Sequence, residues 1–115
     1  MVLRRSEMER EGRPQMRGGR GECTLTLVGG RSLQQHLRVL AEIVIPPGAS
    51  IGRHDHTHET EYYLILEGKG LVDDNGTLVE VHPGDTVITT GGATHSIETI
   101  GETSLRMIAV IVTDA

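Results

Sequence analysis

Hydrophobic and polar residues alternate along most of the chain, in short segments that end at glycine, proline or asparagine. Alternation with a period of two is typical of a half-buried β-strand, whereas an amphipathic helix repeats every 3.6 residues. The pattern predicts about nine short strands, at residues 22–28, 37–45, 54–56, 61–67, 71–72, 78–81, 86–90, 95–100 and 105–112. No segment has a convincing helical period.

The turns between these segments favour an all-β fold. Asn75-Gly76 is a strong hairpin signal, and Pro46-Pro47-Gly48 closes the segment before it. Closely spaced strands with such turns indicate a sandwich or a closed barrel. A chain of 115 residues is long enough for one hydrophobic core, so one domain is expected.

The amino-acid composition excludes several classes of function. The chain has no Phe, no Trp and two Tyr, so the core must be aliphatic. The formal net charge is −5, although the first twenty residues hold six Arg and only three Glu. An acidic body with few aromatics argues against nucleic-acid binding, and no apolar run is long enough to span a membrane. The single cysteine, Cys23, excludes an intrachain disulfide, and a cytoplasmic location is expected.

Four side chains that can bind a metal lie within eight residues: His54, His56, His58 and Glu61. On a strand, His54 and His56 point to the same face, about 7 Å apart. A turn over residues 57–60 would bring Glu61 back beside them. A set made of His56, His58 and Glu61 leaves only two residues for that turn, so His58 is predicted to be a loop residue at the mouth of the site.

The spacing around these residues resembles the first signature motif of the cupin superfamily, G-x5-H-x-H-x4-E-x6-G, which residues 48–68 match at every fixed position. The second cupin motif, G-x5-P-x-G-x2-H-x3-N, corresponds to residues 84–99. Both glycines and the histidine, His95, are present, whereas Thr90 and Thr99 replace the proline and the asparagine.

This resemblance implies an all-β jelly-roll barrel in which His54, His56, Glu61 and His95 hold one divalent metal ion. The barrel is assigned to residues 22–115 and an N-terminal arm to residues 1–21. Such a ligand set suits Mn²⁺ or Fe²⁺, with Zn²⁺, Ni²⁺ and Co²⁺ as alternatives. Four protein ligands in an octahedral shell leave two positions for a small ligand.

Alternation places Tyr63 and Ile65 on the same face as Glu61, beside the metal. Tyr63 is a candidate substrate-binding residue because its hydroxyl can donate a hydrogen bond, although a core tyrosine would fit the pattern equally well. No carboxylate outside the ligand set is placed to donate a proton, so no catalytic residue is assigned.

The chain is similar to the small cupins called oxalate-decarboxylase-like or mannose-6-phosphate-isomerase-like. That resemblance implies a metalloenzyme acting on a small carboxylate such as oxalate. Two alternatives stay open: an Fe- or Mn-dependent dioxygenase or isomerase, and a non-catalytic module that binds or senses a small organic acid.

Two features concern partners. Residues 1–21 are either a flexible leader or an arm that folds over the barrel or a partner subunit, and one of their arginines could bind an anionic ligand. The segment at 105–112 is apolar on both faces apart from Arg106. Together with Leu64 and Leu66, on the face opposite Glu61, it predicts a homodimer.

Overall fold

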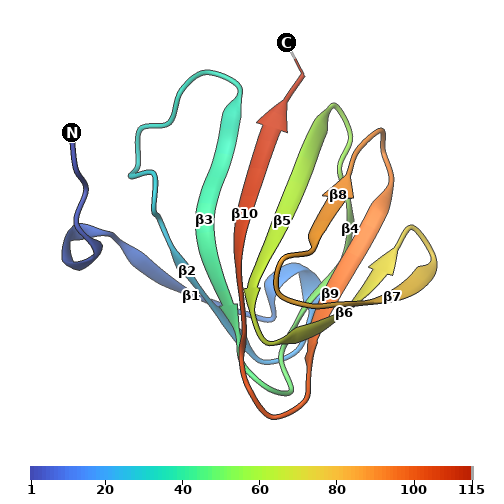
Figure 1. Cartoon of the computed structure of the whole chain (residues 1–115). Helices are drawn as coiled ribbons and strands as arrows, with labels where there is room; N and C mark the ends of the chain where they lie inside the picture. Colours follow the sequence, from blue (N-terminus) through green and yellow to red (C-terminus); the bar gives the residue numbers. More distant parts are fainter. Residues whose placement is uncertain (115) are drawn as a thin grey trace.

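The computed structural model of the chain describes residues 1–114 and consists of two antiparallel sheets packed face to face (Figure 1). The strands are β1 (Arg10–Pro14), β2 (Glu22–Thr26), β3 (Leu37–Ile45), β4 (Ser50–Asp55), β5 (Glu59–Glu67), β6 (Lys69–Asp74), β7 (Thr77–Val81), β8 (Thr86–Thr89), β9 (Thr94–Ile100) and β10 (Leu105–Thr113). Two short 3-10 helices, η1 (Arg5–Glu7) and η2 (Met16–Gly18), precede β2. Neither is long enough to cross a membrane, and no other helix occurs in residues 1–114.

The order of the strands confirms the predicted jelly-roll fold. One sheet has the order β1-β2-β3-β10-β5-β8, and the other has the order β4-β9-β6-β7. Neighbours in space are often far apart in sequence, because β10 lies between β3 and β5, and β9 lies between β4 and β6. Two packed sheets with such crossing connections form a jelly roll.

The nine predicted strands are all present, with ends that differ by a few residues. A tenth strand, β1, lies in the N-terminal arm and pairs with β2 at the edge of the larger sheet. Its sequence, Arg-Glu-Gly-Arg-Pro, has no apolar alternation, which is why the hydrophobic pattern did not indicate a strand. Charged residues and proline are common on edge strands, because one side of the strand has no partner.

The space between the sheets is filled by aliphatic side chains, as the composition predicted. Within residues 1–114, Tyr63 is the only aromatic residue among the buried hydrophobic residues. The largest fully buried aliphatic side chains come from both sheets: Ile43, Ile45, Ile51, Ile65, Ile97, Leu105 and Met107. Close packing of branched side chains on strands makes a rigid support for the groups that project from the same strands.

The N-terminal arm is attached to both sheets. Arg5 donates two hydrogen bonds to the buried Glu42 carboxylate of β3, at 3.0 and 2.7 Å. The backbone around η2 lies directly on β4, where Arg20 N donates to Ser50 Oγ and Ser50 N donates to Arg20 O, both at 2.9 Å. Of the two predicted alternatives, the structure therefore has an arm folded onto its own barrel. The domain boundary at residue 21 stays a prediction.

Candidate metal centre

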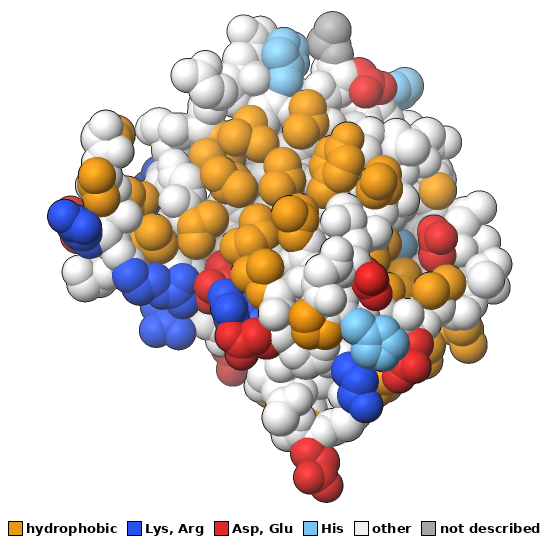
Figure 2. All heavy atoms as spheres, viewed as in Figure 1, with side chains coloured by type: hydrophobic (Ala, Val, Ile, Leu, Met, Phe, Trp, Pro, Cys, Tyr) orange, Lys and Arg blue, Asp and Glu red, His pale blue; other side chains and the backbone are white. Residues whose placement is uncertain are grey.

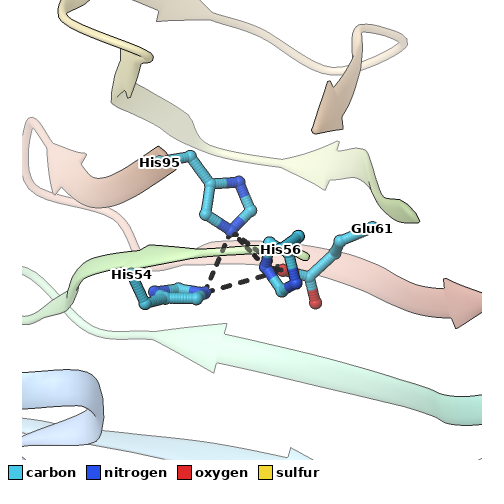
Figure 3. Close-up of side chains that lie close together, drawn as sticks. All are labelled: His54, His56, Glu61 and His95. Carbon is cyan, nitrogen blue, oxygen red and sulfur yellow. Dashed lines mark hydrogen bonds and ion pairs between the residues drawn. The ribbon is translucent and has the colours of Figure 1, made fainter. Parts of the chain in front are cut away.

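Three strands and one turn bring the predicted ligands together at one end of the barrel. His54 lies on β4 directly opposite His95 on β9, as their pairing in the sheet shows. His56 follows the end of β4, where its backbone N–H donates to Ala93 O at 3.2 Å. Glu61 comes from β5 in the other sheet, so the cluster spans the interior between the sheets. Figure 3 shows the three imidazoles and the carboxylate pointing toward one another.

The four side chains converge on one point. His95 Nε2 lies 3.0 Å from both His54 Nε2 and His56 Nε2. Glu61 Oε1 lies 2.8 Å from His56 Nε2, 2.9 Å from His95 Nε2 and 3.8 Å from His54 Nε2. Two ligands at right angles, each about 2.1 Å from an ion, are about 3.0 Å apart. Four of the five separations therefore match neighbouring ligands of one divalent ion.

A buried carboxylate oxygen supports the same interpretation. Glu61 Oε1 makes no hydrogen bond, although two imidazole nitrogens lie within 2.9 Å. Leaving a buried charged oxygen without a partner is costly. A cation at the centre of the cluster would satisfy this oxygen and the three nitrogens together, so the residues present are compatible with a divalent metal.

The outer nitrogen of each imidazole has a partner that fixes the ring. His54 Nδ1 donates to the Gly52 carbonyl at 2.7 Å, which leaves a lone pair on Nε2. His56 Nδ1 lies 2.5 Å from Glu59 Oε2, and His95 Nδ1 lies 2.8 Å from Thr89 Oγ1. Such partners of the outer nitrogen orient metal-binding histidines and make them more basic.

The electrostatics of the cluster keep the carboxylate ionised. Burial raises the pKa of Glu61, but the three histidine side chains that face the carboxylate outweigh burial and hold the pKa well below its usual range. Burial lowers the pKa of His95. For His56 burial acts in the same direction, but Glu61 and Glu59 outweigh it, and the pKa is raised. Glu61 therefore carries a negative charge, which favours binding of a cation.

The structure brings together the four predicted ligands and leaves His58 outside. His58 is exposed, in the turn between β4 and β5, and its backbone has a positive φ of 61°. The turn is shorter than the sequence indicated, because β5 begins at Glu59 rather than at Glu61. Tyr63 and Ile65 are buried on the same face as Glu61, as predicted, and the Tyr63 ring stacks on His95 with centroids 4.9 Å apart.

Glu59 and Thr89 were not identified from sequence, although both contact a histidine of the cluster. Glu59 was assigned to the turn, but it lies on the same face of β5 as Glu61, two positions away. Arg38 donates two hydrogen bonds to its carboxylate, at 2.9 and 2.8 Å. Period-two alternation from Glu61 would have indicated Glu59, whereas the position of Thr89 depends on the pairing of β5 with β8.

A cavity of about 240 Å³ opens beside the cluster. Its walls combine three residues of the cluster, without His95, with Tyr63 and with aliphatic and basic residues from the arm and the larger sheet: Arg13, Met16, Arg17, Leu25, Arg38, Val39, Ile43, His54, His56, Glu61, Tyr63 and Ile111. Apart from Glu61, no carboxylate lines it among the described residues. The surroundings of the cluster are thus apolar and positively charged, which suits a small anion.

Fold and site define a small cupin. Residues 41–111 match the model of the cupin domain, and the chain belongs to this family.

Two of the matches extend along almost the whole chain. The chain is 42% identical over 113 residues to the oxalate-binding protein of Thermotoga maritima, covering 97% of this chain and 93% of the relative. The crystal structure of a predicted oxalate decarboxylase from Thermotoga maritima superposes with a TM-score of 0.89 and 40% identity, covering 98% of this chain and 99% of that one. The cupin domain of Cnp3 from Schizosaccharomyces pombe has a TM-score of 0.74 at 20% identity, over 90% of this chain and 69% of that one, a likeness of fold alone.

The geometry of the cluster predicts which histidines retain a metal. His54→Ala or Glu61→Gln should abolish stoichiometric binding, because each removes a converging ligand, whereas His58→Ala should keep about one ion per chain. Bound metal should also raise the free energy of unfolding, by about 4 kcal/mol when the free ion is a thousandfold above Kd. Elemental analysis and thermal unfolding with and without chelator would measure both. Loss of metal in His58→Ala with retention in His54→Ala would show that a different set of histidines binds.

The contact between Thr89 and His95 generates a second prediction. Thr89→Val keeps the shape of the side chain but removes the hydroxyl at His95 Nδ1, so Mn²⁺ affinity should fall about 10- to 100-fold. Thr90→Val is a matched control, because Thr90 is exposed and its hydroxyl pairs with Thr60 instead. Competition with a fluorescent chelator would measure both affinities, and equal values for the two variants would contradict a role for Thr89.

Proposed function

We propose that this protein binds a small organic acid such as oxalate at a divalent metal held by His54, His56, Glu61 and His95. The observation that carries this proposal is the position of the cluster, which opens into a cavity with arginines at its rim. Similarity to an oxalate-binding protein along nearly the whole chain supports the same class of ligand.

The metal is proposed to be Mn²⁺ or Fe²⁺, because neutral imidazoles with one carboxylate suit these ions, although Zn²⁺, Ni²⁺ and Co²⁺ accept the same donors. Held there, such an ion would act as a Lewis acid toward carboxylate oxygens. Glu61 and the three histidines hold it, and Glu59 and Thr89 keep two of the imidazoles in position.

Tyr63 is proposed to donate a hydrogen bond to the bound acid. Its side chain lines the cavity, and its hydroxyl lies 3.4 Å from His95 Nε2. Burial raises the pKa of Tyr63 well above its usual value, and the Glu61 charge raises it further. The hydroxyl therefore stays protonated and serves as a donor.

Several features favour binding over decarboxylation. A decarboxylase needs a group that delivers a proton to the product carbon. Glu61 is committed to the metal, and Glu59 is held by Arg38 and His56. Hydrogen bonds from Arg38 lower the pKa of Glu59, which burial opposes and His56 reinforces, so this carboxylate is a poor acid. Decarboxylase, dioxygenase and isomerase activities stay predictions from the family resemblance.

Calorimetry of the Mn²⁺-loaded protein tests the proposal. Oxalate should bind with a stoichiometry of about one per chain, and the metal-free protein should not bind it, because the ion supplies the main contact. Assays for CO2 and formate on the same sample should show little turnover. A metal-loaded protein that ignores oxalate would refute the proposed ligand class, and rapid CO2 release would establish the decarboxylase instead.

The outer face of the larger sheet is proposed to be the interface of a homodimer. Figure 2 shows hydrophobic side chains gathered over the central strands β3, β10 and β5. Leu64, Leu66, Ile88 and Val112 are 39 to 57% exposed there, and half-buried apolar residues of the same strands continue the surface. Extended apolar patches on soluble domains mark interaction sites.

The cytoplasmic location also stays a prediction.

A charge placed on this face should separate the subunits. Leu64→Glu should convert a dimer to a monomer, because a carboxylate would have to be buried without a partner at the interface. Leu78→Glu is the control, since Leu78 is 67% exposed but lies on β7 of the smaller sheet. Analytical ultracentrifugation distinguishes the two states. A monomeric wild type, or a dimer that survives Leu64→Glu, would place the interface elsewhere or remove it.

A further inference from the structure

Three arginines line the cavity beside the metal centre, and only one of them lacks a carboxylate partner among residues 1–114. Arg38 is bound by Glu59 through two hydrogen bonds, and Arg13 forms an ion pair with Glu11 at 2.7 Å. Arg17 forms no ion pair with any described residue, yet it lines the same cavity. It is therefore the arginine whose charge is available to a ligand.

The backbone that carries Arg17 is firmly placed. η2 lies on β4 so closely that a Cβ atom at Gly52 would collide with the Arg17 carbonyl, and one at Gly19 would collide with the Ser50 carbonyl. Met16, the neighbour of Arg17, packs against the hydrophobic core. The close approach of glycines fixes the position of the segment relative to β4, the strand that carries His54.

The conformation of this segment is unusual. Gln15 and Arg17 have φ values of 49° and 53°, in the left-handed region that residues with a Cβ atom seldom adopt. Backbone strain of this kind persists where the surrounding structure imposes it, and it is concentrated at functional sites. Here the left-handed turn keeps Met16 against the core while Arg17 stays exposed at the mouth of the cavity.

Arg17 shares the walls of the cavity with residues of the cluster. His54, His56 and Tyr63 line the same cavity as Arg17, and the Tyr63 hydroxyl lies 3.4 Å from His95 Nε2. A ligand in this cavity would therefore be within reach of both Arg17 and the metal centre.

From this arrangement we propose that Arg17 binds the carboxylate oxygens that the metal leaves free in a dicarboxylate ligand, so that the N-terminal arm selects dianions over monoanions. The guanidinium is planar and can bind two carboxylate oxygens at once. Oxalate has four carboxylate oxygens. Those that do not bind the ion would be available to Arg17. This inference rests on the proposed function, because Arg17 would contact the same organic acid that the metal centre is proposed to bind.

The test compares two ligands of similar size that differ by one charge. Mn²⁺-loaded wild type, Arg17→Ala, Arg17→Lys and Arg10→Ala are titrated calorimetrically with oxalate and with glyoxylate, and metal content is measured for each. Arg10 is the matched control, because it is exposed on the same arm and does not line the cavity. In Arg17→Ala, oxalate affinity should fall about 10- to 100-fold, as expected for a charge-assisted hydrogen bond.

Further expected results separate a ligand contact from a general effect of charge or shape. Glyoxylate affinity should change less than oxalate affinity, Arg17→Lys should recover part of the loss, and Arg10→Ala should match wild type. Metal content should be equal in all four proteins. The inference is overturned if Arg17→Ala binds oxalate as tightly as wild type, or if both ligands weaken equally. Failure of the wild type itself to bind oxalate would refute the proposed function, a result that is distinct from a failure confined to the role of Arg17.

Discussion

The site depends on a carboxylate that is buried among three imidazoles. Glu61 Oε1 is inaccessible to water and makes no hydrogen bond, so its charge has to be balanced by the groups facing it. Removing a charge from water without compensation is too costly for a small domain to sustain. The outer nitrogens of the imidazoles all bond to fixed partners, which turns the inner nitrogens toward the same point. A cation at that point would satisfy the carboxylate oxygen and the three nitrogens together.

The jelly roll supplies this convergence because its two sheets face each other across a narrow core. His54 and His95 are opposite one another on paired strands of the smaller sheet, so their separation is set by backbone hydrogen bonds. Glu61 projects inward from the larger sheet, between the pairings of β5 with β10 and β8. An aliphatic core holds the sheets at a fixed distance. Each side chain of the cluster therefore projects from rigid backbone and has few torsions that can rotate. A preorganised site requires this.

Much of this arrangement could be predicted from sequence, because the ligands lie on motifs with fixed spacing and the strands alternate clearly. The parts that could not be predicted depend on tertiary contacts. β1 has no apolar alternation and becomes a strand only through its pairing with β2. Thr89 meets His95 through the pairing of β8 with β5, which no local pattern encodes. Glu59 lies two positions before Glu61, so the alternation of β5 places both on one face, but a predicted turn two residues too long left Glu59 outside the site.

The residues that bear on the choice of ligand therefore lie outside the ligand set. Three histidines and a glutamate support many chemistries on one fold, so they alone do not specify a ligand. The cavity adds a protonated tyrosine, aliphatic walls and an arginine without a carboxylate partner among the described residues. Within residues 1–114, no acidic group that lines it is free to deliver a proton. Donors and positive charge without an available acid stabilise a bound carboxylate more readily than they cleave it. Because the arm supplies Arg17, a segment outside the cupin motifs would set the charge of the acid that is held.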